Sequence, residues 1–295
     1  MSTVSPETVQ PWLEELIGRL VPEKGWPVLP GKAPRPDATA WVALTLASWG
    51  RLDKDWGKAL DLLTGFQRSN GSLPVFASQP EATWPTSLAV MAWSASKKHE
   101  ASMQRALDYL LKIEIRHVAD PAIGHALQLR GWPWIAETHP WVEPSCMGLL
   151  ALSAAGREDP RSDEALRMLL NRQLEAGGWN YGNTKVFGAT LRPQTGPSGL
   201  ALMTLAGRTE MKKVAHSIRH LRQQVEQTRS PRSLGLVAMG LRAWSPEHSF
   251  CSQLVESLSR QDFGPVPSDH LSIALCALSG QILPGVKVAS LTESP

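Results

Sequence analysis

The chain of 295 residues has few cysteines and no excess of charge of either sign. Its three cysteines, Cys146, Cys251 and Cys276, lie far apart, which excludes a disulfide framework and a C-x-x-C metal pair. With 30 basic and 27 acidic side chains the net charge is +3, so the composition does not favour a nucleic-acid partner. No apolar run approaches the roughly 20 residues of a membrane-spanning helix. The first residues lack the apolar core of a signal peptide, and we expect a cytoplasmic protein.

Tyrosine and phenylalanine are also scarce, whereas tryptophan is abundant. The chain has 12 Trp beside 5 Phe and 2 Tyr, the reverse of ordinary usage. A Trp side chain combines a large apolar area with an electron-rich face that attracts cations, and with one N–H donor. These side chains can therefore cover joints between helices or form the wall of an apolar cavity.

Six apolar segments of similar design recur along the chain. Each is rich in Ala and Gly and apolar on nearly all sides, and several end at a glycine that can adopt a positive φ. Four of them have proline at one register, which the first turn of a helix tolerates. We expect six buried, closely packed helices that begin near Asp37, Trp84, Glu143, Gly196, Ser230 and Asp269.

Amphipathic segments alternate with these six. Their apolar residues recur every three or four positions with charged residues on the other face, which predicts helices with one side in water. They span 10–20, 58–67, 101–113, 162–173, 211–227 and 252–260, and a further short helix is expected over 123–129. The alternation predicts an all-α fold, an α/α toroid of about six inner and six outer helices. We expect one domain over residues 1–295, with loose ends of about 10 and about 12 residues.

The segment Q-L-E-A-G-G-W, Gln173 to Trp179, fits the Q-x-x-x-G-x-W signature of squalene and oxidosqualene cyclases. Degenerate copies begin at Gln67 and Gln128. Together with the P-[ST]-x-x-[AG]-L helices, the pattern resembles the terpenoid cyclase and protein prenyltransferase β-subunit superfamily over residues 41–279. The resemblance implies a toroid that handles isoprenoids. Within it, we expect Trp179 to cover the joint between an outer and an inner helix.

Class II cyclases of this superfamily protonate an alkene or epoxide with the middle Asp of a D-x-D-D-T-A motif. The nearest match is R-P-D-A-T-A, where Asp37 falls on the proton donor while Arg35 and Ala38 replace the flanking carboxylates. The alternative interpretation of Asp37 is a helix N-cap, a position that favours Asp. The missing carboxylates favour this second interpretation.

The zinc site of protein prenyltransferases is not matched. Pro144 stands where an Asp would precede Cys146, and Ile273 stands where the family has a His. His139, Glu143 and Cys146 are close in sequence, but Cys146 is more typical of a small buried residue on an Ala/Gly helix. We therefore expect no metal and no cofactor.

In each buried segment, one residue stands just before the position of the proline. These six residues should lie together at the end of the ring where the helices begin. In chain order these residues are Ala38, Trp84, Glu143, Gly196, Ser230 and Asp269. Glu143 and Asp269 either complement the helix dipoles or act as proton donors where tryptophans exclude water. The gathered N-termini also favour an anion such as a diphosphate, with Arg130, Lys185 or Arg192 as counter-charges.

The candidate acids are thus Glu143, Asp269 and Asp37. The candidate substrate-binding residues beside them are aromatic or polar: Trp84, Trp132, Trp134, Trp141, Asn180, Tyr181 and Cys146. For Asn180 and Tyr181, the alternative is a glycine-rich turn whose side chains hold a loop.

The leading hypothesis is an isoprenoid-handling enzyme similar to class II, proton-initiated terpene and squalene cyclases. Its partner would be a polyprenyl or other apolar small molecule. Because squalene-hopene cyclases resemble two fused toroids, this single toroid takes a smaller substrate or needs a partner subunit. The basic segment 212–222 is a candidate peripheral contact with an anionic membrane, the alternative being a solvated face. The second hypothesis is a non-catalytic toroid that binds a lipid or a protein.

Overall fold

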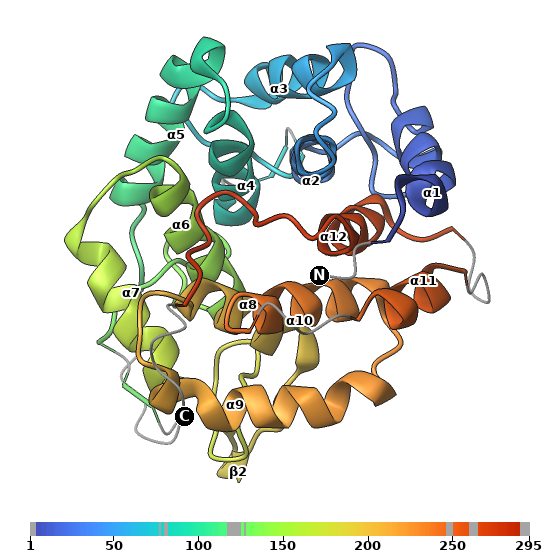
Figure 1. Ribbon diagram of the computed structural model, residues 1–295. Helices are drawn as coiled ribbons and strands as arrows, with labels where there is room; N and C mark the ends of the chain where they lie inside the picture. The colour runs from blue at the N-terminus through green and yellow to red at the C-terminus, as the bar shows by residue number, and fades with distance from the viewer. Residues whose placement is uncertain are drawn as a thin grey trace.

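Two concentric rings of helices form the molecule (Figure 1). The computed structural model describes residues 4–76, 78–79, 82–116, 125–126, 128–245, 250–259 and 265–289. The inner ring consists of α2 (Pro36–Ser48), α4 (Thr83–Trp93), α6 (Val142–Ala154), α8 (Thr195–Leu205), α10 (Pro231–Arg242) and α12 (Ser268–Leu278). The outer ring consists of α1 (Pro6–Gly18), α3 (Lys54–Phe66), α5 (Glu100–Lys112), α7 (Pro160–Asn171), α9 (Met211–Gln224) and α11 (Cys251–Ser259). The predicted all-α toroid with six inner and six outer helices is confirmed.

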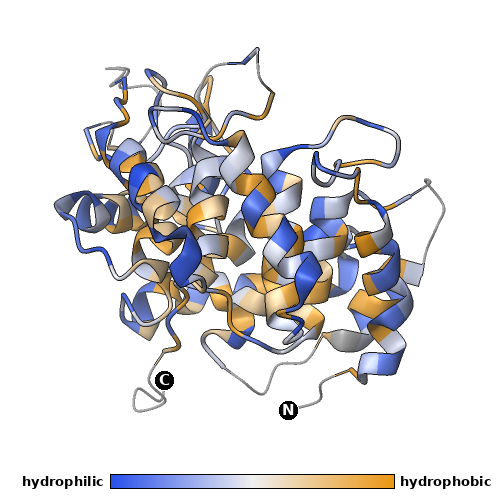
Figure 2. Cartoon of the chain, turned by 90° about the horizontal axis from the view of Figure 1, so that it is seen from above, coloured by the Kyte–Doolittle hydropathy of each residue, from blue (hydrophilic) through white to orange (hydrophobic). Residues whose placement is uncertain are grey.

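The inner ring is closed. Each inner helix packs against the next one in chain order, and α12 returns to pack against α2. Inner helices are buried on nearly all sides, which their Ala- and Gly-rich sequences permit. The outer helices expose one face, and helices at the periphery of Figure 2 carry both hydrophobic and hydrophilic residues.

Minor elements complete the fold. Short 3₁₀ turns lie at η1 (Lys97–His99) and η3 (Val225–Gln227), and a small hairpin pairs β1 (Lys185–Val186) with β2 (Ala189–Thr190). The helix expected over 123–129 falls partly outside the described residues, and those of its residues that are described are not helical. Among the described helices, none is long and apolar enough to cross a membrane.

The joints between outer and inner helices repeat one arrangement. A hydroxyl in the first turn of an inner helix accepts the backbone N–H of a residue in the preceding connection: Thr39 from Trp26, Thr86 from Leu73, Ser145 from Trp132, and Ser198 from Trp179. The three tryptophans also donate their indole N–H to the third-last residue of the preceding outer helix: Trp26 to Leu16, Trp132 to Leu110, and Trp179 to Leu169. The expected role of Trp179 as the cover of a helix joint is confirmed, and Trp132 has the same role.

The two ends of the ring are the rim, where the inner helices begin, and the tail end, where they finish. At the tail end, residues 280–289 (the tail) cross the ring, as the dark red segment of Figure 1 shows. Arg208 Nη2 donates to Gly285 O at 2.5 Å, and Ala289 N donates to Ala243 O at 3.0 Å. The described part of the tail is therefore packed, although the sequence predicts loose ends, because glycine allows the backbone to approach closely. At the N-terminus, where loose residues are also expected, helix α1 already begins at Pro6.

Candidate functional site

The rim brings together the second residues of the six inner helices. In chain order they are Asp37, Trp84, Glu143, Gly196, Arg232 and Asp269. The register predicted from proline has Ala38 and Ser230 instead of Asp37 and Arg232, and is wrong at these two positions. The reason is that α2 and α10 have proline as their first residue, whereas α4, α6 and α8 have it as their third. Proline fits anywhere in the first turn, so it does not define one register.

The connections that precede the inner helices form a collar around the rim. We use this name for the described residues of 19–35, 67–82, 113–141, 172–194 and 265–267. Three inner helices donate their first backbone N–H to collar segments: Thr83 N to Trp134 O at 3.0 Å, Val142 N to Tyr181 O at 2.8 Å, and Ser268 N to Val28 O at 2.7 Å. The loop around Trp132 and Trp134, expected over one mouth of the toroid, thus lies at the rim.

Glu143, in the first turn of α6, combines burial with an unpartnered oxygen. Its side chain is 5% exposed, and Arg232 Nη2 donates to its Oε2 at 2.9 Å. Its Oε1 is buried and has no hydrogen-bond partner in the described structure. Arg232 reaches α6 from α10 past Gly196 on α8, where an added Cβ would lie 3.4 Å from Arg232 Nη1. The absence of a side chain at Gly196 therefore makes room for this ion pair.

Asp269, in the first turn of α12, has a similar free oxygen. Its Oδ1 is buried without a hydrogen-bond partner among the described residues, although 27% of the side chain is exposed. Its Oδ2 lies 3.9 Å from His270 Nε2. Burial lowers the pKa of His270, and Arg232 lowers it further, while Asp269 acts in the opposite direction. Arg232 thus acts electrostatically on groups of both α6 and α12.

Asp37 is held differently from the other two acids. Arg35 Nε donates to Oδ1 at 2.9 Å and Arg35 Nη2 to Oδ2 at 2.5 Å, and the indole N–H of Trp84 donates to Oδ2 at 3.2 Å. The N-cap of α2 is Arg35, so the N-cap interpretation of Asp37 is wrong. Three N–H donors therefore occupy both oxygens of this carboxylate. The arrangement fits a group that orients Trp84 better than one that releases a proton.

Three of the four predicted wall tryptophans lie at the rim and are partly exposed. Trp84 and Trp134 meet edge to face with centroids 5.2 Å apart. Trp141 stacks on His139 at 4.3 Å and on the backbone of Gly182, where a Cβ would be 2.6 Å from the ring. These contacts fix the ring orientations, which is a requirement for a shaped cavity wall.

Trp132 has a different environment from these three rings. It is completely buried, and the guanidinium of Arg161 stacks 4.7 Å from its centroid. Arg161 also donates to the carbonyls of Gly131 and Ile113 at the end of α5. Trp132 is therefore part of the scaffold and not a wall residue of the rim.

The remaining predicted site residues, Asn180, Tyr181 and Cys146, lie in different environments. Asn180 uses both ends of its amide within its own loop, donating to Arg192 O at 2.6 Å and accepting from Tyr181 N at 2.8 Å. This agrees with a side chain that holds a loop. The Tyr181 side chain is exposed. Cys146 is buried on α6, and burial raises the pKa of its thiol to about 12. It is therefore a packing residue rather than a nucleophile.

Two arginines that build the site, Arg232 and Arg172, were not predicted from the sequence. Arg232, which pairs with Glu143, is not among the residues predicted to hold an anion at the rim; of those residues, Arg130 lies 3.9 Å from Glu164 of α7. Arg172 is buried and donates to the carbonyls of Pro140 and Gly182, so it ties together the two loops around Trp141. Their long side chains act far from their own helices, and local periodicity does not reveal such contacts.

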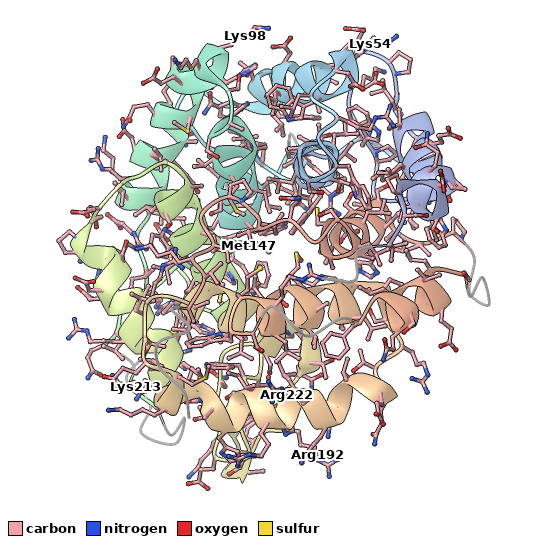
Figure 3. The ribbon with its side chains drawn as sticks, viewed as in Figure 1. Lys54, Lys98, Met147, Arg192, Lys213 and Arg222 are labelled. Carbon is pink, nitrogen blue, oxygen red and sulfur yellow. The ribbon has the colours of Figure 1, made fainter. Side chains whose placement is uncertain are left out.

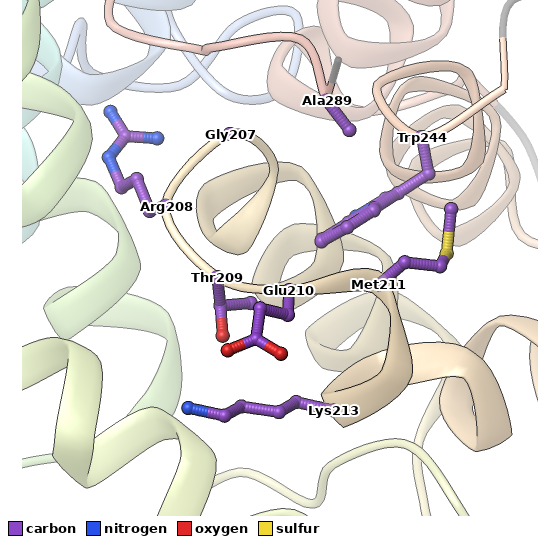
Figure 4. Close-up of a pocket in the computed structure, with 8 residues that line it drawn as sticks. All are labelled: Gly207, Arg208, Thr209, Glu210, Met211, Lys213, Trp244 and Ala289. Atoms are coloured by element: carbon purple, nitrogen blue, oxygen red, sulfur yellow. The ribbon is translucent and has the colours of Figure 1, made fainter. Parts of the chain in front are cut away.

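Three cavities lie at the tail end. One, of about 400 Å³, is lined by Gly207, Arg208, Thr209, Glu210, Met211, Lys213, Trp244 and Ala289 (Figure 4). Two others, of about 520 and 570 Å³, share the tail residues Gln281, Ile282 and Leu283. None of the three is lined by a predicted site residue. In the described part of the chain, no three His, Cys, Asp or Glu side chains are grouped to hold a metal.

The fold is shared with solved structures of low sequence identity. A protein from Actinoplanes is 17% identical with a TM-score of 0.62, over 93% of this chain and 98% of that one. A variant of the type II terpene cyclase MstE from Scytonema, in complex with its substrate geranylgeranyl dihydroxybenzoate, is 15% identical with a TM-score of 0.54, over 95% and 82%. A glycoside hydrolase family 76 mannosidase from Bacteroides thetaiotaomicron is 12% identical with a TM-score of 0.59, over 93% and 96%.

At such identities the likeness concerns the fold alone. No protein-family profile matches the chain, and no curated protein matches its sequence. The chain therefore has a toroid fold like that of type II terpene cyclases, a fold that it also shares with a mannosidase.

Proposed function

We propose that the protein is an isoprenoid-handling enzyme that resembles type II terpene cyclases and protonates a polyprenyl substrate at the rim. One observation supports this most strongly: Glu143 is buried, oriented by Arg232 through one oxygen, and has its other oxygen free. Buried polar atoms are normally hydrogen-bonded, and an unpartnered one points to a functional role. The likeness to a cyclase with a bound prenylated substrate supports the same proposal.

In the proposed reaction, Glu143 holds the proton on Oε1. The π electrons of the substrate's terminal alkene form a C–H bond with this proton, which leaves a tertiary carbocation on the neighbouring carbon and a carboxylate on Glu143. Arg232 stabilises that carboxylate through Oε2. The next alkene attacks the cation and closes a ring, and the last cation loses a proton to a base. The product is then an isomer of the substrate.

The rim tryptophans have a physical role in this scheme. The faces of Trp84, Trp134 and Trp141 would stabilise the cation by about 0.5–2 kcal/mol each. Asp37 orients Trp84 through the indole N–H. Asp269 is the second candidate acid, and it is more solvated than Glu143. The Q-x-x-x-G-x-W element and the membership of the terpenoid cyclase superfamily belong to this proposal. The substrate would be a single polyprenyl chain, because one toroid encloses less space than two.

A second candidate function is glycoside hydrolysis. It is favoured by one observation: two carboxyl groups, Glu143 and Asp269, each have a buried oxygen without a partner at the same end of a toroid. A pair of carboxyl groups acts as acid and base or as acid and nucleophile in such hydrolysis. The third alternative is a non-catalytic toroid that binds a lipid or protein partner.

The test is incubation with farnesyl diphosphate, geranylgeranyl diphosphate, geranylgeranyl dihydroxybenzoate, squalene and α-mannosides, followed by mass spectrometry. We expect a cyclised isomer from a prenyl substrate. Glu143→Gln keeps the size of the side chain but removes the proton donor, and should lower turnover by about 10²–10⁴. Glu226→Gln, at an exposed position of η3, is the matched control and should be as active as the wild type.

Three results would contradict the proposal. Turnover of a mannoside and of no prenyl substrate would support the second function. Binding that raises the melting temperature without any product would support the non-catalytic toroid. Full cyclase activity of Glu143→Gln together with loss of activity in Asp269→Asn would identify Asp269 of α12, and not Glu143 of α6, as the acid.

A further inference from the structure

Exposed apolar side chains gather on the collar. The described part of the chain exposes eight large apolar or aromatic side chains: Leu29, Leu52, Phe76, Ile135, Tyr181, Phe187, Ile282 and Val288. Five of them, Leu29, Phe76, Ile135, Tyr181 and Phe187, lie in the connections that lead into α2, α4, α6 and α8. Four successive connections therefore contribute to one set, and all four belong to the rim.

The backbone contacts of the collar show that these residues share one end of the molecule. Ile135 forms an isolated antiparallel bridge with Ala82, on the connection that also contains Phe76. Tyr181 O accepts the N–H of Val142, at the start of α6. Leu29 follows Val28, which is bonded to the start of α12. The exposed apolar side chains thus lie at the same end of the ring as the candidate acids.

Phe187 is the most exposed of the set. Its relative exposure is 103%, and it is the first residue of the two-residue turn that joins β1 to β2. Phe187 and Gly188 both have positive φ, 49° and 77°, as in a type I′ turn. Asn, Asp and Gly favour that first position, and a bulky side chain there is strained. Folding therefore gains nothing from a Phe at this position, which points to an external contact.

Cationic side chains accompany these apolar ones. Lys185 lies two residues before Phe187, Arg192 follows the hairpin, and Lys32 lies near Leu29; all three are exposed. Figure 3 shows Arg192 at the edge of the molecule beyond α9. The described collar also exposes four acids, Glu23, Glu114, Glu137 and Glu175, against six exposed cations, Lys24, Lys32, Arg116, Arg130, Lys185 and Arg192. Aromatic and aliphatic side chains among Lys and Arg are typical of surfaces that lie on an anionic bilayer.

We propose that the collar docks on the surface of a bilayer that contains anionic lipid, with Phe187 inserted among the acyl chains and Lys185, Arg192 and Lys32 at the headgroups. A lipid surface fits better than a protein partner, because the five apolar side chains are spread over four connections and are interspersed with exposed Lys and Arg. In this orientation the rim faces the membrane. The inference does not depend on catalysis.

The proposal differs from the lipid contact predicted for the basic helix α9. That helix lies along the side of the ring, and its residue Lys213 lines the cavity at the tail end, as Figures 1, 3 and 4 show. Lys212 of the same helix pairs with Glu210 at 2.5 Å. The charges at the start of α9 therefore face away from the rim, and α9 cannot place them on the surface that Phe187 contacts.

The experiment is co-sedimentation of the full chain with large unilamellar vesicles of phosphatidylcholine, with and without phosphatidylglycerol. We expect binding that requires phosphatidylglycerol and weakens with salt. Phe187→Ser should lower the partition coefficient by about tenfold or more, because a buried Phe side chain accounts for at least that factor. Ile282→Ser, at an exposed position of the tail end, is the matched control and should bind like the wild type.

Phe187→Ser should fold normally, since it removes a strained exposed residue, and an unchanged melting temperature checks this. Lys185→Glu should weaken binding to the anionic vesicles by a smaller factor. Failure of the wild type to bind either vesicle would overturn the proposal. An equal loss in Ile282→Ser would also overturn it. So would a concentration-dependent dimer that Phe187→Ser abolishes, because that result would assign the collar to a protein interface.

Discussion

The two ends of the ring are closed by different chemistry. At the tail end the chain covers itself: Gly285 lies so close to α6 that an added Cβ would be 2.0 Å from Leu150 O, and Arg208 binds the Gly285 carbonyl. At the rim, charged and aromatic side chains meet instead, and Glu143 and Asp269 each have a buried oxygen without a partner. Satisfied backbone contacts stabilise a fold, whereas unpartnered polar atoms reduce its stability and persist where function needs them. The comparison associates packing with the tail end, and it supports our proposal that the chemistry takes place at the rim.

The largest effect on the free energy of unfolding should come from replacing a tryptophan of the scaffold instead of one at the rim. Trp179→Ala removes a completely buried ring that joins α7 to α8, and should lower the free energy of unfolding by about 3–5 kcal/mol. Trp134→Ala removes a partly exposed ring at the rim and should cost clearly less. Urea denaturation of both variants measures the difference. Equal losses would mean that Trp134 is scaffold too.

The tail closure can be tested with two glycines that both have positive φ. Gly31→Ala meets no atom within 4 Å, so only the left-handed backbone opposes it, at about 1–2 kcal/mol. Gly285→Ala has the same backbone cost and also clashes with the α6 backbone, which should add about 1–3 kcal/mol. Thermal unfolding compares the two. If both variants have the same melting temperature, the contact of the tail with α6 does not stabilise that end of the ring.

The rim should also respond to pH through His139, which stacks on Trp141. Burial, and then Arg172, lower the pKa of His139 from 6.5, so the folded chain binds fewer protons than the unfolded chain. Its contribution to stability is complete above pH 6.5 and is lost as the pH falls below 6.5 towards the lowered pKa. We expect His139→Gln to lose less stability than the wild type between about pH 7.5 and about pH 5.5 in urea titrations.

Part of that pH dependence should remain in the variant, because burial also lowers the pKa of His220 and His270. An unchanged pH dependence in His139→Gln would show that His139 does not contribute to it.

The smallest effect is expected from removing the rim ion pair as a whole. The double variant Glu143→Leu with Arg232→Leu should change the free energy of unfolding by no more than about 1 kcal/mol, because apolar replacement of a buried pair is often neutral. Arg232→Leu alone leaves Glu143 buried without its partner and should be less stable than the double variant. Denaturation of the three chains checks this. A large loss of unfolding free energy in the double variant would show that the ion pair serves mainly to stabilise the fold.

Much of the ring could be predicted from local sequence because packing and periodicity coincide. The apolar Ala/Gly segments are the inner helices, and the amphipathic segments are the outer ones, with bounds shifted by a few residues. The rim register was less predictable, because Pro36 and Pro231 begin their helices while Pro144 stands third in α6. Trp132 could not be told from Trp134 by sequence, since two residues separate a buried joint from a partly exposed wall.

By itself, the sequence determined the toroid, because the spacing of apolar residues decides which face of each helix is buried and the six-fold alternation leaves few ways to bury them. It also indicated the rim as the end where acids and tryptophans meet. Only the tertiary structure decided which acid is held by an arginine through one oxygen while its other oxygen is free. That depends on a contact between Glu143 and Arg232, which are 89 positions apart, made past Gly196 on the helix between them. Long-range contacts of this kind have no local signal, since they arise only after the ring has closed.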